Sequence, residues 1–129
     1  MIRRMLILAA TLTVFAAAPL AHAAGALDGK TFSGVIGKKG ETATQPDSLV
    51  FKDGTFESTL CTTFGYGTGA YQTTPQDEGM TFTAQTTSGT GGTMDWHGVV
   101  IGDQIEATVT TMENGQKSES WFQGKVKGE

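Results

Sequence analysis

The stretch TMDWHGVVIGDQIEATVT, residues 93–110, contains the pattern from which the fold is predicted. Its second half alternates strictly, because apolar residues at 105, 107 and 109 are separated by glutamate and threonine. A period of two is typical of a strand with one buried and one solvated face. Gly102-Asp103 interrupts the pattern and suits a two-residue hairpin turn. The stretch therefore predicts two antiparallel strands, 93–101 and 104–112, joined by a tight turn.

Similar turn signals recur on both sides of this hairpin. They are Asp53-Gly54, Glu78-Gly79, a glycine-rich loop at 88–92 and Asn114-Gly115. Threonine, valine and phenylalanine between them favour strands, and no amphipathic helix is expected after the N-terminal segment. We expect eight strands in all, at residues 30–37, 47–53, 55–61, 68–73, 80–87, 93–101, 104–112 and 117–127.

A triplet of the form aromatic-x-Gly suggests how these strands are closed. It occurs as Phe32-x-Gly34, Trp96-x-Gly98 and Phe122-x-Gly124. Each glycine leaves a gap on the face that carries the aromatic ring, and a ring from a neighbouring strand can fill it. Two copies lie in the first and last strands, and pairing these strands removes both sheet edges. The fold class predicted is all-β, an antiparallel up-and-down meander of about eight strands closed into a small barrel; chance recurrence in a chain with 18 glycines is the alternative.

Residues 1–23 have the pattern of a cleavable signal peptide. Arg3 and Arg4 precede an apolar run that is too short for a membrane span, and Ala21-His22-Ala23 offers small residues for cleavage. We expect the mature chain to be one domain, residues 24–129, in the periplasm or secreted, with no integral membrane segment after cleavage.

The negative charge of the mature chain argues against a nucleic-acid partner. Loss of the two arginines leaves seven lysines against thirteen acidic residues, a formal charge of −6. No basic patch remains, so we expect no nucleic-acid partner. A single cysteine in an exported chain leaves no internal disulfide, and the core must hold the fold alone.

The predicted strand at 55–61 ends in the only cysteine. Its alternation places Phe56, Ser58 and Leu60 on one face and Cys61 on the opposite face. The residues that follow, Phe64 to Tyr71, contain both tyrosines and three glycines. This segment therefore raises the question of whether Cys61 is a nucleophile, a metal ligand, a cross-link or a packed side chain.

The chemistry around Cys61 is sparse. A nucleophilic thiolate needs a base or a cation, and the one histidine of the mature chain, His97, is expected to point outward from a non-adjacent strand. Zinc needs three or four ligands, which one cysteine and one histidine do not supply. We therefore expect no catalytic residue, no metal and no cofactor. A cross-link to a second copy remains an alternative to the favoured role, packing beneath the loop of Phe64 and Tyr66.

Four aromatic residues are the candidate ligand-binding residues: Phe64, Tyr66, Tyr71 and Trp96. Tyrosines beside glycines at a barrel rim can stack on a ligand or close over it. The same rings can instead fill the mouth of the barrel as core. Both alternatives stay open at the level of sequence.

The start of the mature chain, Leu27-Asp28-Gly29-Lys30-Thr31-Phe32, resembles the opening of calycins, the group of lipocalins and fatty-acid-binding proteins. The lipocalin pattern is Gly-x-Trp, and here the aromatic residue stands one position later. The spacing of Asp53-Gly54, Cys61, Tyr66, Tyr71 and Trp96-x-Gly98 also resembles that of short exported bacterial proteins. The resemblance implies a small barrel and a small ligand.

Three functions follow for comparison. The favoured one is an exported barrel that binds a small apolar molecule, since eight strands enclose an interior that holds one small ligand or is just filled by side chains. The alternative is a solid-core barrel that acts as a protein-interaction or scaffold module. An enzyme is disfavoured by the missing acid–base sets, and we expect no enzymatic activity.

Overall fold

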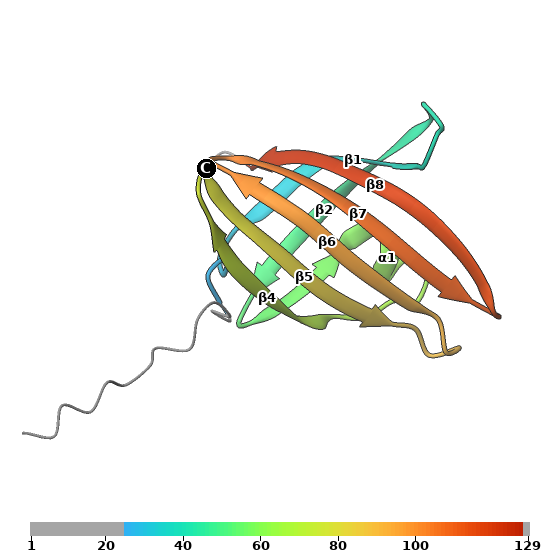
Figure 1. Ribbon diagram of the computed structural model, residues 1–129. Coiled ribbons are helices and arrows are strands. Elements are labelled where there is room, and N and C mark those ends of the chain that lie inside the picture. Colours follow the sequence, from blue (N-terminus) through green and yellow to red (C-terminus); the bar gives the residue numbers. More distant parts are fainter. Residues whose placement is uncertain (1–24, 128–129) are drawn as a thin grey trace, which may run out of the picture.

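Eight strands follow one another along the chain, and each pairs antiparallel with the next (Figure 1). The computed structural model describes residues 25–127, so the predicted signal peptide at 1–23 lies outside the described residues. The strands are β1 (Thr31–Lys38), β2 (Thr44–Lys52), β3 (Thr55–Ser58), β4 (Gly69–Gln76), β5 (Gly79–Thr87), β6 (Thr93–Ile101), β7 (Gln104–Glu113) and β8 (Gln116–Val126), with one helical turn, α1 (Thr59–Thr62), after β3.

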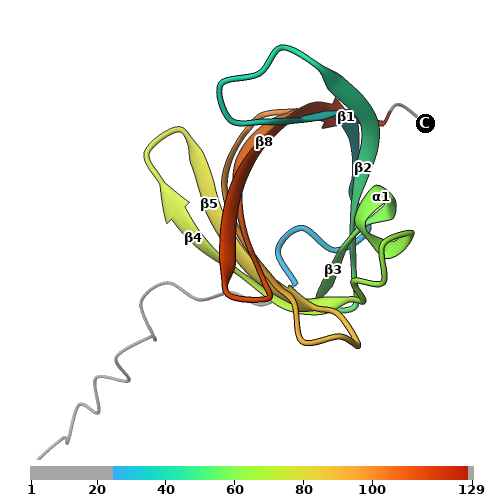
Figure 2. The ribbon, with the colours of Figure 1, turned by 90° about the vertical axis from the view of Figure 1, so that its right-hand side faces the viewer.

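The first and last strands pair and close the barrel (Figure 2). Gly34 of β1 stands directly opposite Gly124 of β8. A Cβ atom added to Gly34 would lie 1.9 Å from the carbonyl oxygen of Gln123, so only glycine allows the two strands to approach this closely here. The predicted closed meander is confirmed, and it is also the architecture that the resemblance to calycins implies.

Two of the tight turns have the backbone that their sequences predict. Asp53 and Gly54 have φ values of 52° and 74°, and Asn114 and Gly115 have 51° and 76°. Two successive residues with positive φ match the right-handed twist of the flanking strands, which favours Asp-Gly and Asn-Gly in such loops. These turns fix the register of β2 with β3 and of β7 with β8.

Aromatic side chains fill the interior. The ring of Phe51 lies within 4.9–5.9 Å, centroid to centroid, of four other rings. Edge-to-face pairs at this distance stabilise a core, and full burial of each large apolar side chain contributes about 1.5–3 kcal/mol. The buried aromatic residues are Phe32, Phe51, Phe56, Tyr66, Tyr71, Phe82, Trp96 and Phe122.

The glycine of the second aromatic-x-Gly triplet has the predicted packing. A Cβ atom on Gly98 would lie 2.3 Å from the ring of Phe82, which comes from the neighbouring strand β5. The ring thus occupies the volume that a side chain at position 98 would need. At Gly124 the ring belongs to Phe122 of the same strand.

The predicted strand at 55–61 is wrong in its second half. β3 ends at Ser58, and residues 59–62 form the turn α1. The hydroxyl of Ser58 accepts a hydrogen bond from the Cys61 amide, and the buried Asp47 carboxylate accepts bonds from the Leu60 amide and the Ser58 hydroxyl. Side-chain oxygens that cap a helical turn in this way compete with the strand ladder. As a result Cys61 is buried and Leu60 is partly exposed, the reverse of the predicted faces.

β3 is shorter than the two strands beside it, β2 and β4, and each of those strands contains a proline. β3 pairs with β4 at only two positions, and Pro46 of β2 and Pro75 of β4 both lie beyond its reach. The Phe51 amide points to β1 and the Tyr71 amide to the β3 side. Because amides alternate along an antiparallel strand, the nitrogens of both prolines face the β3 side. The missing donors therefore cost no ladder hydrogen bond.

One end of the barrel, the floor, is covered by the segment before β1. Leu27 is fully buried, and its amide donates to the hydroxyl of Tyr71 at 2.9 Å. The Asp28 carboxylate accepts from the same hydroxyl at 2.7 Å and from the Gly54 amide at 2.9 Å. These bonds hold the segment against the turn between β2 and β3. Among residues 25–127 no helix has the length and apolarity needed to span a bilayer.

Candidate functional site

The opposite end of the barrel contains a pocket, here called the mouth pocket. It has a volume of about 450 Å³ and lies between the β1–β2 hairpin, α1 and the start of β6. Its apolar walls come from Ile36, Leu60, Phe64 and Met94. The remaining lining residues are Gly37, Lys38, Glu41, Ala43, Thr44, Gln45, Cys61 and Ser120.

The alternation of β1 and β6 explains why Ile36 and Met94 reach this pocket. Ile36 is two residues beyond Gly34, and Met94 is two residues before Trp96, so each continues an inward-facing row toward the mouth. Both pack against the buried core. The pocket is therefore the open end of the same interior that the aromatic rings fill below.

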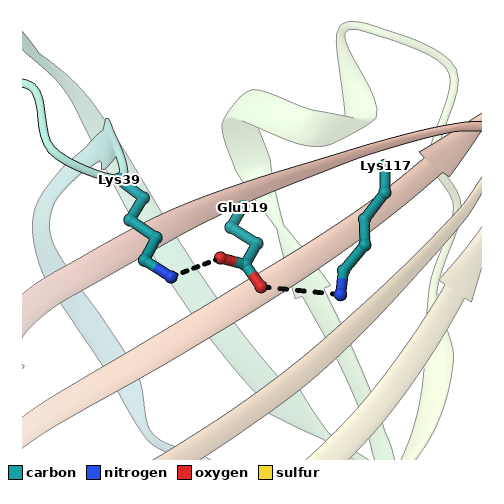
Figure 3. Close-up of polar contacts among 3 residues, drawn as sticks. All are labelled: Lys39, Lys117 and Glu119. Carbon is teal, nitrogen blue, oxygen red and sulfur yellow. Dashed lines mark hydrogen bonds and ion pairs between the residues drawn. The ribbon is translucent and has the colours of Figure 1, made fainter.

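An ion-pair cluster lies beside the mouth pocket and ties the β1–β2 loop to β8 (Figure 3). Lys39 donates to the Glu119 carboxylate at 2.7 Å, and Lys117 lies 3.7 Å from its other oxygen. The hydrogen bond from Lys39 lowers the pKa of Glu119, and the same bond raises the pKa of Lys39. Exposed pairs contribute little stability, and this cluster joins to β8 the loop that forms one wall of the pocket.

Tyr66 closes the other half of the mouth. It is only 2% exposed, and its hydroxyl donates to the Glu113 carboxylate at the end of β7. The backbone around it is held as well, since the Tyr66 amide donates to Cys61 and the Gly67 amide donates to Thr87. Burial and then the bond to Glu113 raise the pKa of Tyr66 to about 12. The neutral phenol is therefore the form that stabilises this closure.

Tyr71 lies at the floor, far from the mouth along the barrel. It is 1% exposed, and burial and then the bond to Asp28 raise its pKa to about 12. Its ring packs edge-on against Phe51 at 4.9 Å. The structure thus places Tyr66 and Tyr71 at opposite ends of the molecule, although only four residues lie between them in sequence.

The four candidate ligand-binding residues do not form one cluster. Of these, Phe64 alone lines the mouth pocket, and its side chain is 68% exposed at the rim. Trp96 is fully buried one inward position below Met94, and its ring contacts Phe56 at 5.0 Å. The indole N–H of Trp96 has no hydrogen-bond partner among the described residues.

Cys61 is a buried wall residue of the mouth pocket. Burial raises the pKa of its thiol, and the nearby Asp47 carboxylate adds to this, although the Ser58 hydroxyl opposes it. A neutral thiol is a poor nucleophile. His97 is exposed on the outer face of β6, so the structure does not bring the two together. Among residues 25–127 there is no group of three or more His, Cys, Asp or Glu that could hold a metal ion.

Sequence reasoning missed most of the mouth pocket. The alternation of β1 and β6 contained the signal for Ile36 and Met94, because both share a face with residues predicted to be inside. No local signal identified the role of Asp47, because the Ser58 hydroxyl that donates to its carboxylate lies 11 residues away in sequence. Leu60 reaches the pocket only because β3 stops early.

No family model matches this chain, and neither a curated protein nor a solved structure matches it.

Proposed function

We propose that this protein is an exported barrel that binds a small, largely apolar molecule in the mouth pocket. The observation that carries the proposal is a pocket of about 450 Å³ with walls of Ile36, Leu60, Phe64 and Met94. Small-molecule sites are concave, mostly apolar and roughly 300–1,000 Å³ in volume. The pattern of residues 1–23 supports export, and the resemblance to calycins supports the binding of a ligand at the barrel mouth.

The aromatic rings that fill the lower half of the barrel limit how deeply a ligand can enter. Phe51, Phe56 and Trp96 occupy the space below the mouth pocket, so the bound molecule rests on these rings and stays near the rim. Charged or polar groups are added to the apolar walls by Lys38, Glu41, Thr44, Gln45 and Ser120. A compact molecule with an apolar part and a polar part suits this arrangement better than a long apolar chain.

The test uses N-phenyl-1-naphthylamine, a neutral apolar dye that fluoresces on leaving water, and the thiol of Cys61 as a reporter. We expect saturable binding of the dye and slower alkylation of Cys61 when the dye is bound, because Cys61 lines the mouth pocket. Phe64→Ala should weaken dye binding without loss of folding, since this side chain is exposed. The matched control is Ile101→Ala, which truncates an exposed apolar side chain at the floor end and should bind as the unaltered protein does.

Native mass spectrometry of the protein purified from its own host would identify a carried molecule. Dye that binds with equal affinity to Phe64→Ala and does not protect Cys61 would contradict the proposal, as would the absence of any dye binding.

The second candidate is an interaction or scaffold module. The observation that favours it is the dense packing of the aromatic core, in which the ring of Phe51 lies 5.3 Å from that of Phe56 and 5.4 Å from that of Phe82. A protein with no dye binding and no carried molecule would favour this reading.

A further inference from the structure

The outer surface of the barrel has a hollow across β5, β6, β7 and β8, the strands that lie side by side in Figure 1. Its volume is about 610 Å³. The outward-facing residues that line it are Thr81, Thr83, His97, Val99, Glu106, Thr108, Trp121 and Gln123. It is separate from the mouth pocket, with which it shares no lining residue.

Trp121 forms a fixed wall of this outer hollow. Its indole N–H donates to the Lys38 carbonyl at 3.2 Å, and its ring lies over Gly37 of β1. A Cβ atom at position 37 would approach the ring to 2.7 Å, so the glycine leaves room for the indole against the strand. The ring is thus held in place by its hydrogen bond and this contact before any ligand arrives, which lowers the entropy cost of binding.

A second hollow of about 250 Å³ lies on the other side of the same indole. It shares Thr108 and Trp121 with the first hollow and adds Thr110, Glu119 and Lys39. The indole therefore separates two adjoining depressions on one outer face. This arrangement suits a ligand made of repeated units, with one unit on each side of the ring.

The polar groups of the larger hollow narrow the class of ligand. Thr83, His97, Thr108 and Trp121 follow one another across the four strands as register partners. Beside them lie Glu106 and Gln123, both exposed and directly paired. Hydroxyl, imidazole, carboxylate and amide groups all offer hydrogen bonds to a ligand, and covering them with an apolar molecule would leave them unpaired at a cost.

Charge excludes an anionic ligand from the same hollow. Its lining residues include one carboxylate and neither lysine nor arginine. Three threonines and a glutamine among the outward-facing lining residues suit a neutral molecule with many hydroxyl groups, and the indole suits an apolar face that stacks on it. We propose that the face formed by Trp121, Glu106 and Gln123 binds a neutral carbohydrate chain.

The test is a titration of the ¹⁵N-labelled mature protein with neutral hexasaccharides of glucose, mannose, galactose and N-acetylglucosamine, followed by NMR. The chain has two tryptophans, so the indole N–H signal of Trp121 is assigned by its loss in Trp121→Phe. We expect this signal and the amides of β6 to β8 to shift saturably with at least one sugar. Titration reaches about 10 mM, where binding of only a few kcal/mol is still measurable.

Variants separate a binding face from a structural one. Trp121→Ala and Gln123→Ala should weaken the affinity for the sugar about tenfold or more, as loss of a stacking ring or a central hydrogen bond does. Glu106→Gln keeps the shape and should weaken binding less than Glu106→Ala. Gln72→Ala, an exposed residue on the outer face of β4, should bind with unchanged affinity.

Two results would overturn the inference: no shift of the Trp121 signal with any of the four sugars, or shifts confined to residues of the mouth pocket. Protection of Cys61 and the effect of Phe64→Ala on dye binding report on the mouth pocket, and the Trp121 signal reports on the outer face, so each proposal can fail without the other.

Discussion

At the scale of single residues, a pair of glycines determines whether the barrel closes. Gly34 and Gly124 face each other across the seam of β1 and β8, where Gln123 leaves no room for a Cβ atom. The aromatic-x-Gly triplets predicted this seam, because a glycine two positions from an inward ring must lie on the same face. The sequence could not predict that Gly34 meets backbone while Gly98 meets a ring, since that depends on the distance between strands.

The change Gly34→Ala should destabilise the protein by about 2–3 kcal/mol or more, because the new methyl group meets backbone that cannot move aside without breaking the seam. The free energy of unfolding in urea measures this. The matched control is Gly89→Ala in the loop before β6, where a Cβ atom meets nothing within 4 Å, and it should change stability by no more than about 0.5 kcal/mol. Equal effects of the two substitutions would show that the seam tolerates a side chain.

At the scale of elements, the shortness of β3 shapes both the mouth and the barrel wall. Capping by Ser58 and Asp47 ends the strand early and turns Cys61 inward and Leu60 toward the mouth pocket. Alternation predicted the strands on either side, since it needs only neighbouring residues. It could not predict this stop, because Asp47 acts from the preceding strand. The place of Leu60 in the mouth pocket was missed for the same reason.

The two prolines beside β3 should act against strand addition. Pro46 and Pro75 are exposed, and each places its missing donor on the β3 side. The double change Pro46→Thr with Pro75→Thr restores both N–H groups and should increase self-association, measured by sedimentation velocity over a range of concentrations. Gln72→Thr is the control, since it alters β4 without adding a donor, and it should stay as dispersed as the unaltered protein. A fully dispersed double variant would show that the prolines have no such role.

At the scale of the whole molecule, each end of the barrel holds a buried tyrosine whose hydroxyl donates to a carboxylate. Tyr71 bonds Asp28 at the floor, and Tyr66 bonds Glu113 at the mouth. The sequence left open whether these rings fill the core or contact a ligand. It could not predict that the two tyrosines lie at opposite ends of the barrel. It also could not predict which carboxylates they bond, because these come from distant parts of the chain. The eight-strand closed meander, by contrast, followed from local turns and alternation.

Both phenols should make stability fall at alkaline pH. Their pKa values rise from 10.0 to about 12 in the folded protein, so the native state holds these protons more tightly than the unfolded chain does. The resulting stability is complete below the unfolded pKa and is lost as pH rises through the folded pKa, between 10.0 and about 12. Urea unfolding at a series of pH values should show this decline, and Tyr71→Phe should reduce it.

The chain has only two tyrosines, so the tyrosinate absorbance of the native protein comes from Tyr66 and Tyr71 and from no other side chain. Absorbance that grows in around the ordinary pKa of 10.0 while the protein stays folded would contradict the assignment.

The seam between β1 and β8 also sets the order of events in folding. Each of the other pairings joins strands that are consecutive in the chain, so each can form as a hairpin soon after its residues are available. The seam joins the first strand to the last and must wait for the whole chain. Until then β1 and β8 both present open edges, the state most exposed to aggregation. The slowest step in reaching the native barrel is therefore expected to be ring closure, and a chain shortened by its last strand would remain an open sheet.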